Sequence, residues 1–471
     1  MKSQFAKDVA KLINDKNNKI YYYGLQKDSK GVDKFYDAKN LLSQVYYSRK
    51  KFKFKNKLKI KNLKKYNFFK TLFEVTSNRV FIDDEIKKKK NIFYEICSHH
   101  YDFIKDNKIT HFVYWATPHF HFDISLFCVA ELLNLKQFIF HQTNIQNTFC
   151  IRKNWYSQHM YKVNKNNINI IDKYLDNKRI STNALKSRSL QFDDFYGKSF
   201  FLIRFLIFMI KKTLRILLIK NNNDKDPYFL YTDDNYRFKE AYLRIKMLVW
   251  KLYTYLYFNY VASKKKINLK TKYIYFALHS EPERTIMPEG GIFYDQIRAI
   301  KLLRKSIPKE FKIYVKEHPN QFWLRDSTIE TLFFKGTKFY KELLKIKNLE
   351  LISNKIKADK IIKNAISTAT ITGTSGWESI KMGNKAIVFG YPWYSNHKDC
   401  LCIDKDNNQS KNKIFSFLFK KPKQNKKYMK IFTKNLNKYL AEAETWSSYV
   451  KGPKNIKLVK KIFAKKLIRI F

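Results

Sequence analysis

The chain has 471 residues, 45% of them hydrophobic, so it is long enough to bury one or two full cores and to form two or three domains. Its 94 lysines and arginines against 40 acidic residues give a net charge of +54. The five cysteines are odd in number and none forms a CxxC pair, which argues against a disulfide framework or a zinc ribbon.

The positive charge has two readings. It suits a polyanionic partner such as nucleic acid, an anionic membrane surface or a phosphorylated substrate. It is also what an AT-rich coding sequence produces, because lysine and asparagine are abundant while glycine, alanine and proline are scarce. The lysines are spread along the whole chain, so no specific nucleic-acid site is predicted. The opening segment, MKSQFAKDVAKLINDKNNKI, lacks the apolar stretch of a signal peptide, and a cytoplasmic location is expected.

Short β-rich runs alternate with longer helical ones along the chain. Typical helical stretches are DISLFCVAELLNL and YDQIRAIKLLRKSI. This βαβ alternation predicts an α/β protein with parallel sheets and helices on both faces. The predicted strands are Lys19–Gly24, Thr110–Ala116, Gln137–His141, Lys272–His279, Phe311–His318, Leu349–Ser353, Ala369–Thr372 and Lys385–Gly390.

The segment Ser199–Lys220, SFFLIRFLIFMIKKTLRILLIK, is the strongest membrane candidate. Basic residues interrupt it, so it falls short of the ~20 apolar residues that a spanning helix needs. It suits a helix lying at the surface of an anionic membrane, with Phe201, Phe205 and Phe208 immersed and the cations near the headgroups. The alternative is a buried core helix with charged ends.

The alternation breaks at residues 220–238, which are polar and rich in asparagine and read as a linker or exposed loop. A helical stretch follows, and the strand pattern restarts at Lys272. We therefore expect two α/β domains that meet between Lys264 and Thr271: residues 1–263, and residues 264–471 with the C-terminal helices.

Polar, turn-rich sequence follows three strands of the second domain. LHSEPERTIMPEGGIFYDQ follows the first, VKEHPNQ the second, and GTSGWES the third. The carboxyl ends of parallel strands share one edge of a sheet, where ligands usually bind. A glycine-rich turn that opens a helix is also a phosphate cradle, because backbone N–H groups and the helix dipole favour an anion. A plain βα turn is the alternative for GTSG, and no Walker A lysine follows it.

These motifs resemble the C-terminal half of bacterial capsule and surface-polysaccharide biosynthesis proteins. Those proteins are similar to GT-B transferases that use CMP-activated sugar acids such as Kdo, and they carry an HP motif, here His318–Pro319. In the N-terminal half, TPHFHFDISLF (Thr117–Phe127) followed by FIFHQTN resembles a segment of one branch of that family. The resemblance covers roughly residues 110–147 and 272–404.

The resemblance implies a GT-B-like fold, in which two Rossmann-like domains with parallel sheets face a central cleft. It implies a glycosyltransferase that moves a sugar from a CMP-linked donor to a glycan or lipid-linked acceptor, at the inner face of the cell membrane. No cofactor is expected, and no metal either, because a donor with one phosphate has no pyrophosphate for a metal to bridge. The implied nucleotide-binding residues are Lys316, Glu317, His318, Pro319, Gly373, Thr374, Ser375, Gly376 and Glu378, with Glu378 near the ribose.

Catalysis requires a group that deprotonates the acceptor hydroxyl, or a carboxylate nucleophile if configuration is retained. His119 and Asp123 follow a predicted strand and open a helix, although Asp123 also suits a helix cap and His121 suits packing. Glu281 and Glu283 are the alternative pair. Two other functions stay open: transfer of an alditol phosphate from a CDP-linked donor, and binding of nucleic acid through the basic and aromatic side chains.

Overall fold

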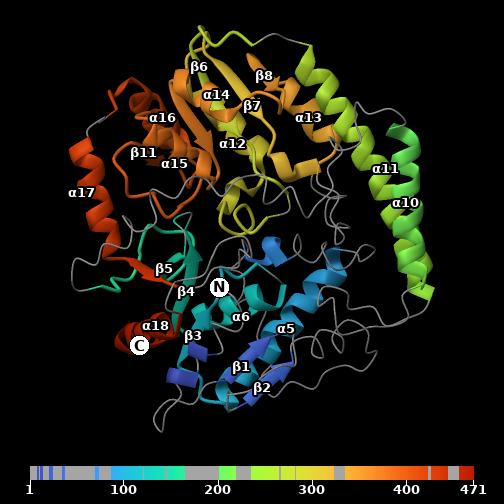
Figure 1. Ribbon diagram of the computed structural model, residues 1–471. Coiled ribbons are helices and arrows are strands. Elements are labelled where there is room, and N and C mark those ends of the chain that lie inside the picture. Colours follow the sequence, from blue (N-terminus) through green and yellow to red (C-terminus); the bar gives the residue numbers. More distant parts are fainter. Residues whose placement is uncertain are drawn as a thin grey trace. The chain divides into compact units, whose positions relative to one another are not determined.

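The computed structural model describes most of the chain (Figure 1). The longer described stretches are residues 86–119, 121–143, 147–164, 201–218, 235–264, 267–281, 283–322, 335–422, 426–443 and 456–470. Shorter pieces are residues 8–9, 11–13, 21–24, 34–37, 69–73 and 145. Most of the predicted linker at 220–238 lies outside the described residues.

The chain forms two compact units. The first comprises residues 1–182, 224–230 and 426–471, and the second comprises 183–223 and 231–425. This division differs from the predicted boundary at 263/264 in two respects. Helices α10 (Phe201–Leu218) and α11 (Asn235–Ser263) belong to the second unit, and the C-terminal helices belong to the first. The arrangement of two sheets around a cleft stays a prediction.

The first unit contains a four-stranded sheet in the order β12-β5-β4-β3. Strands β3 and β4 are parallel, whereas β5 runs antiparallel to both β4 and β12, so this sheet is mixed rather than purely parallel. A separate parallel pair is formed by β1 and β2. The elements are β1 Tyr21–Gly24, β2 Lys34–Asp37, α5 Ile86–Asp106, β3 His111–Tyr114, α6 His121–Leu132, β4 Lys136–Gln142, β5 Thr148–Arg152, α17 Lys426–Asn437, β12 Leu440–Glu442 and α18 Ile456–Ile470.

The second unit contains a six-stranded sheet in the order β11-β10-β9-β6-β7-β8, and every neighbouring pair is parallel. Besides α10 and α11, its elements are β6 Tyr273–Ala277, η2 Gly291–Tyr294, α12 Gln296–Ser306, β7 Lys312–Lys316, η3 Pro319–Phe322, α13 Thr337–Leu344, β8 Leu349–Ile352, α14 Ala358–Asn364, β9 Ser367–Thr370, α15 Thr374–Lys381, β10 Ala386–Val388, β11 Cys400–Cys402 and α16 Asn408–Phe419. The predicted α/β class with parallel sheets is confirmed.

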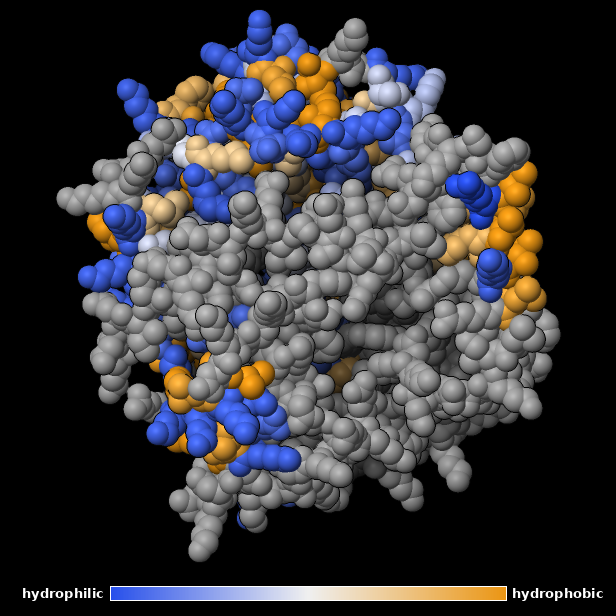
Figure 2. All heavy atoms as spheres, viewed as in Figure 1, coloured by the Kyte–Doolittle hydropathy of each residue, from blue (hydrophilic) through white to orange (hydrophobic). Residues whose placement is uncertain are grey.

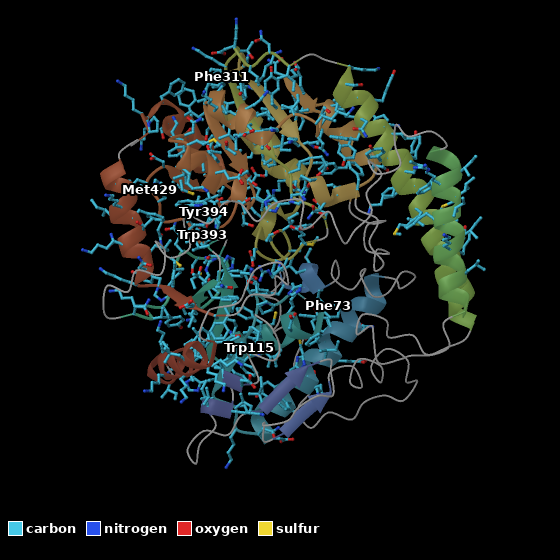
Figure 3. All side chains as sticks on the ribbon, viewed as in Figure 1. Phe73, Trp115, Phe311, Trp393, Tyr394 and Met429 are labelled. Atoms are coloured by element: carbon cyan, nitrogen blue, oxygen red, sulfur yellow. The ribbon has the colours of Figure 1, made fainter. Side chains whose placement is uncertain are left out.

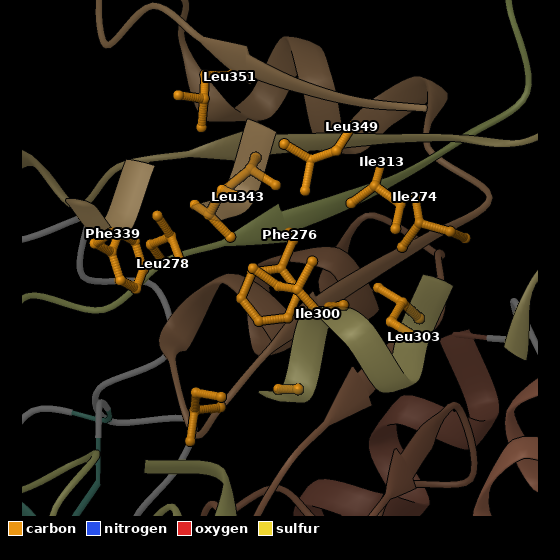
Figure 4. Packing of buried hydrophobic residues seen from close by; sticks show 14 of the residues in the cluster. Ile274, Phe276, Leu278, Ile300, Leu303, Ile313, Phe339, Leu343, Leu349 and Leu351 are labelled. Atoms are coloured by element: carbon orange, nitrogen blue, oxygen red, sulfur yellow. The ribbon is translucent and has the colours of Figure 1, made fainter. Parts of the chain in front are cut away.

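Alternate residues of the central strands enter two cores on opposite faces of this sheet. Ile274 and Phe276 of β6 pack with α12, α13 and α16, as Figure 4 shows for part of that cluster. Tyr273 and Tyr275 of the same strand pack against α14 on the other face. This period of two is what a strand buried on both sides requires. The sheet is therefore buried on both faces at its centre, where β9, β6 and β7 lie next to one another.

The strand order reverses direction between β6 and β9. From β6 the chain proceeds through β7 to β8 on one side, and it then returns to place β9, β10 and β11 on the other. In open parallel sheets of this type, the carboxyl ends of the two strands at the reversal form the usual ligand-binding crevice. The reversal thus marks the edge beyond Ala277 and Thr370 as the place to look for a site.

Candidate functional site

The three polar motifs of the second unit lie at the carboxyl ends of three adjacent strands. LHSEPERT follows β6, VKEHPNQ includes the end of β7, and GTSGWES follows β9. Because β6 pairs with both β7 and β9, the prediction that these motifs share one rim of one sheet is confirmed. The functional role of each side chain on this rim stays a prediction.

His279 is a residue of this rim that the sequence analysis did not select. It is buried, and its Nε2 accepts a hydrogen bond from the backbone N–H of Thr372 (3.2 Å) and lies 3.1 Å from Thr370 Oγ1. Its Nδ1 therefore carries the proton and donates to Thr285 Oγ1 (3.2 Å), which in turn donates to Glu283 Oε2 (3.0 Å). The imidazole thus ties the loop after β6 to the turn after β9.

Burial lowers the pKa of His279 to about 3, and the nearby His318 and Lys335 side chains lower it further. The ring is therefore neutral at physiological pH, as its accepting Nε2 requires. A signal for this residue was present in the sequence. His279 follows the end of β6 by two residues, as His318 follows the end of β7, and the register pairs Ala277 with Lys316.

The glycines of the GTSG turn are explained by close packing. A β-carbon on Gly373 would lie 2.7 Å from Thr370 Oγ1 and 3.0 Å from His279 Nε2. A β-carbon on Gly376 would collide with the hydroxyl of Tyr394, which donates to the carbonyl of Gly373. Tyr394 belongs to an aromatic cluster with Trp393 and with Trp377 of α15. Figure 3 labels Trp393 and Tyr394 of this cluster.

Helix α15 begins at Thr374, which is exposed, and Ser375, which is half-buried. Its N-cap is Gly373, and no side chain of the described residues makes a capping hydrogen bond at this helix end. An uncapped helix N-terminus offers backbone N–H groups and the positive end of the helix dipole to an anion. Glu378, one turn further, is half-buried and its charge acts on Lys316 and on Tyr275.

Glu317 has a structural position in a buried network. Its carboxylate lies 2.9 and 3.1 Å from the Lys335 ammonium, and both side chains are completely buried. Tyr340 donates to the same carboxylate (2.6 Å), as does the backbone N–H of His318 (2.6 Å). Lys335 also donates to the carbonyl of His279. Glu317, predicted to bind the nucleotide, thus links the loop after β7 through Lys335 to the loop after β6.

His318 itself is half-buried, and its Nδ1 accepts a hydrogen bond from the backbone N–H of Asn320 (3.1 Å). The neutral ring therefore carries its proton on Nε2, the tautomer that donates to an anion. Pro319 is exposed and opens the short helix η3. Lys316 is buried, and its ammonium donates a hydrogen bond to the backbone carbonyl of Ile356 (2.6 Å). The Lys316 side chain therefore has a partner within the second unit.

The two glutamates of the LHSEPERT motif, Glu281 and Glu283, differ in environment. Glu281 is buried and accepts a hydrogen bond from Gln296. Burial raises its pKa to about 7, although Lys335 and the Gln296 hydrogen bond act in the opposite direction. Glu283 is half-buried and accepts from Thr285. Of this alternative acid/base pair, Glu283 is the more accessible member and Glu281 the one with a titration near neutral pH.

The N-terminal candidates lie in the first unit, between β3 and α6. His119 Nδ1 donates to the carbonyl of Thr117 (2.8 Å), so the neutral ring has an unprotonated Nε2 that can accept a proton. Asp123 lies in the first turn of α6 and accepts from the backbone N–H of His119 (3.1 Å). This hydrogen bond joins Asp123 to a residue before α6, and its catalytic role stays a prediction. The side chain of His121 lies outside the described residues.

Comparison with known proteins gives a family for part of the chain. Residues 234–442 match the model of the family described as capsule polysaccharide biosynthesis protein. No curated protein matches the sequence.

Several solved structures were found as similar. The β-Kdo 2,7 transferase of Thermosulfurimonas dismutans KpsC is 11% identical, with 79% of this chain and 88% of that chain covered and a TM-score of 0.30. The β-Kdo 2,4 transferase of the same protein is 11% identical, with 46% and 63% covered and a TM-score of 0.24. The UDP-GlcNAc 2-epimerase of Methanocaldococcus jannaschii is 12% identical, with 82% and 83% covered and a TM-score of 0.25.

The matched segment contains β6, β7 and β9 and all three motifs at their carboxyl ends. The resemblance that these motifs predict is therefore confirmed for residues 234–442, which match the model of that family.

Proposed function

We propose that this protein is a glycosyltransferase of capsular or surface-polysaccharide synthesis, and that its donor is a CMP-linked sugar acid such as Kdo. The observation that carries the proposal is the meeting of three family motifs at the reversal of strand order in the second unit. There an uncapped helix N-terminus and a histidine that donates from Nε2 suit one phosphate group.

In the proposed reaction, an acceptor hydroxyl attacks the anomeric carbon of the donor sugar. The bond from that carbon to the phosphate oxygen breaks, and the nucleotide leaves with the electron pair. His318 and the N-terminus of α15 stabilise the phosphate as its negative charge grows. The hydroxyl proton passes to a base, for which the candidates are His119 Nε2, Asp123, Glu281 and Glu283. The reaction uses no metal in this proposal.

The test of the donor is calorimetry with CMP, CDP, UDP and GDP on the full chain. We expect CMP to bind, and His318→Ala to weaken it by about tenfold or more, since a charge-assisted hydrogen bond contributes about 1.5–3 kcal/mol. His159→Ala, the same change at an exposed histidine of the first unit, is the matched control. Preference for UDP or GDP would overturn the donor assignment.

The CDP-alditol alternative is separated by turnover, because that reaction transfers an alditol phosphate and releases CMP from a CDP-linked donor. Binding to DNA or RNA that is strongly salt-dependent and unaffected by His318→Ala would favour the nucleic-acid alternative.

We further propose that the acceptor is a glycan carried on lipid, so that the enzyme works attached to the inner face of the cell membrane. Within the described residues, no helix is both long and apolar enough to cross a bilayer.

A further inference from the structure

Helix α10 presents a row of large aliphatic side chains to solvent. They recur at helical spacing along one side, and each is about half exposed: Ile203 (52%), Leu206 (51%), Ile207 (47%), Ile210 (56%) and Leu214 (48%). Figure 2 shows apolar side chains gathered where α10 lies in Figure 1. We call these five residues the α10 row. Contiguous apolar surface of this kind marks an interaction site.

The row is not needed for packing within the second unit. The opposite side of α10 supplies the core contacts, because Phe205 is 2% exposed and Phe208 and Met209 pack against the core cluster that includes Met247 of α11. The sequence-based expectation that Phe205 and Phe208 enter the membrane is therefore wrong. The side of α10 that carries Phe205 and Phe208 packs against the core, and the side that carries the α10 row is exposed to solvent.

Helix α11, which packs on α10, carries a second set of exposed apolar and tyrosine side chains. They also recur at helical spacing: Tyr242, Ile245, Val249, Tyr253, Leu256 and Tyr260. The ammonium of Lys264 lies over the ring of Tyr260, 4.2 Å from its centroid. Tyrosine beside a cation is a common arrangement at the headgroup level of a bilayer.

The charged residues of α10 and α11 are predominantly basic. Helix α10 contains four lysines and arginines and no acidic residue, and Arg204 and Lys211 are exposed beside the row. Helix α11 contains five basic residues and one acidic residue. A second copy of this chain would bring the same charges against this surface, which costs energy. An anionic partner with an apolar interior has the complementary chemistry.

We propose that the α10–α11 pair docks on an anionic lipid bilayer, with the α10 row among the acyl chains and Arg204 and Lys211 at the lipid phosphates. This docking is the membrane attachment proposed above. It rests on the exposure and charge of α10, and it holds or fails independently of the donor site.

The test is flotation of the full chain with vesicles of phosphatidylglycerol and phosphatidylcholine. The parent should float with these vesicles at low salt, less at high salt, and less with phosphatidylcholine alone. The variant Leu206→Ser/Ile207→Ser/Ile210→Ser should partition about tenfold or more weakly, because three apolar side chains lose their burial in lipid. Phe415→Ser/Phe419→Ser is the matched control, since these side chains are also exposed (51% and 61%) but lie on α16.

Three outcomes would overturn the proposal. The first is vesicle binding of the row variant equal to that of the parent. The second is a dimer in light scattering that the row variant dissociates while neither protein floats, which would make a second copy the occupant. The third is loss of the folded state in both the row variant and the milder Ile210→Ser, which would make the row part of a core. CMP affinity should be unchanged in the row variant, so a failed donor site is detected separately.

Discussion

Replacing Lys335 by methionine removes the cation of a completely buried ion pair. Glu317 would keep the hydrogen bonds from Tyr340 (2.6 Å) and from the His318 N–H (2.6 Å), but its charge would have no counterion. Breaking a buried pair by removing one partner typically costs about 3–5 kcal/mol. Because two hydrogen-bond donors to Glu317 remain, the expected loss is about 3 kcal/mol. A domain of this size should then melt about 6–12 °C lower.

The assay is thermal unfolding followed by circular dichroism, with Lys312→Met as the control. Lys312 makes an ion pair of the same length with Glu350 (2.9 Å), but its side chain is 34% exposed, so its loss should cost only about 0–1 kcal/mol. The double variant Glu317→Gln/Lys335→Met should recover most of the loss, because it buries no unpaired charge. Equal melting temperatures for Lys335→Met and Lys312→Met would refute the reasoning.

Three further predictions concern His279 and Gly373 of the second unit and Asp123 of the first. The pKa of His279 is about 3 in the folded protein and about 6.5 in the unfolded chain, so its contribution to the free energy of unfolding should be complete above pH 6.5. That free energy should fall by about 1.4 kcal/mol per pH unit as the pH drops from 6.5 toward 3. Thermal unfolding of His279→Gln at pH 7 and 5.5 should lack this pH dependence. Gly373→Ala should cost about 1–3 kcal/mol in chemical unfolding, since the new β-carbon would lie 2.7 Å from Thr370 Oγ1. Asp123→Asn should lower turnover by two to four orders of magnitude if Asp123 is the base, with CMP affinity nearly unchanged; normal turnover would leave that role to His119 or Glu283.

The sequence by itself determined the local elements and the motifs that follow them. Strands β6, β7 and β10 lie within the predicted ranges. Short runs of apolar, β-branched and aromatic residues are typical of strands that are buried on both faces of a parallel sheet. The positions of His318 and of the GTSG turn beyond strand ends follow from the same local pattern. Strand β9 begins two residues before its predicted range, since Ser367 and Thr368 carry no apolar signal although they are buried.

The tertiary structure decided everything that depends on pairing between distant residues. The tie from His279 to Thr370 and Thr372 spans more than ninety positions, and no local pattern encodes it. The pairing of β12 with β5 likewise draws the C-terminal segment into the first unit.

Only the fold could also decide which side of α10 is buried. Phe205 and Ile207 are both apolar, so helical periodicity alone does not distinguish a core side from an exposed one. The packing of α11 against Phe208 and Met209 makes that choice, because a helix buries whichever side its neighbours cover.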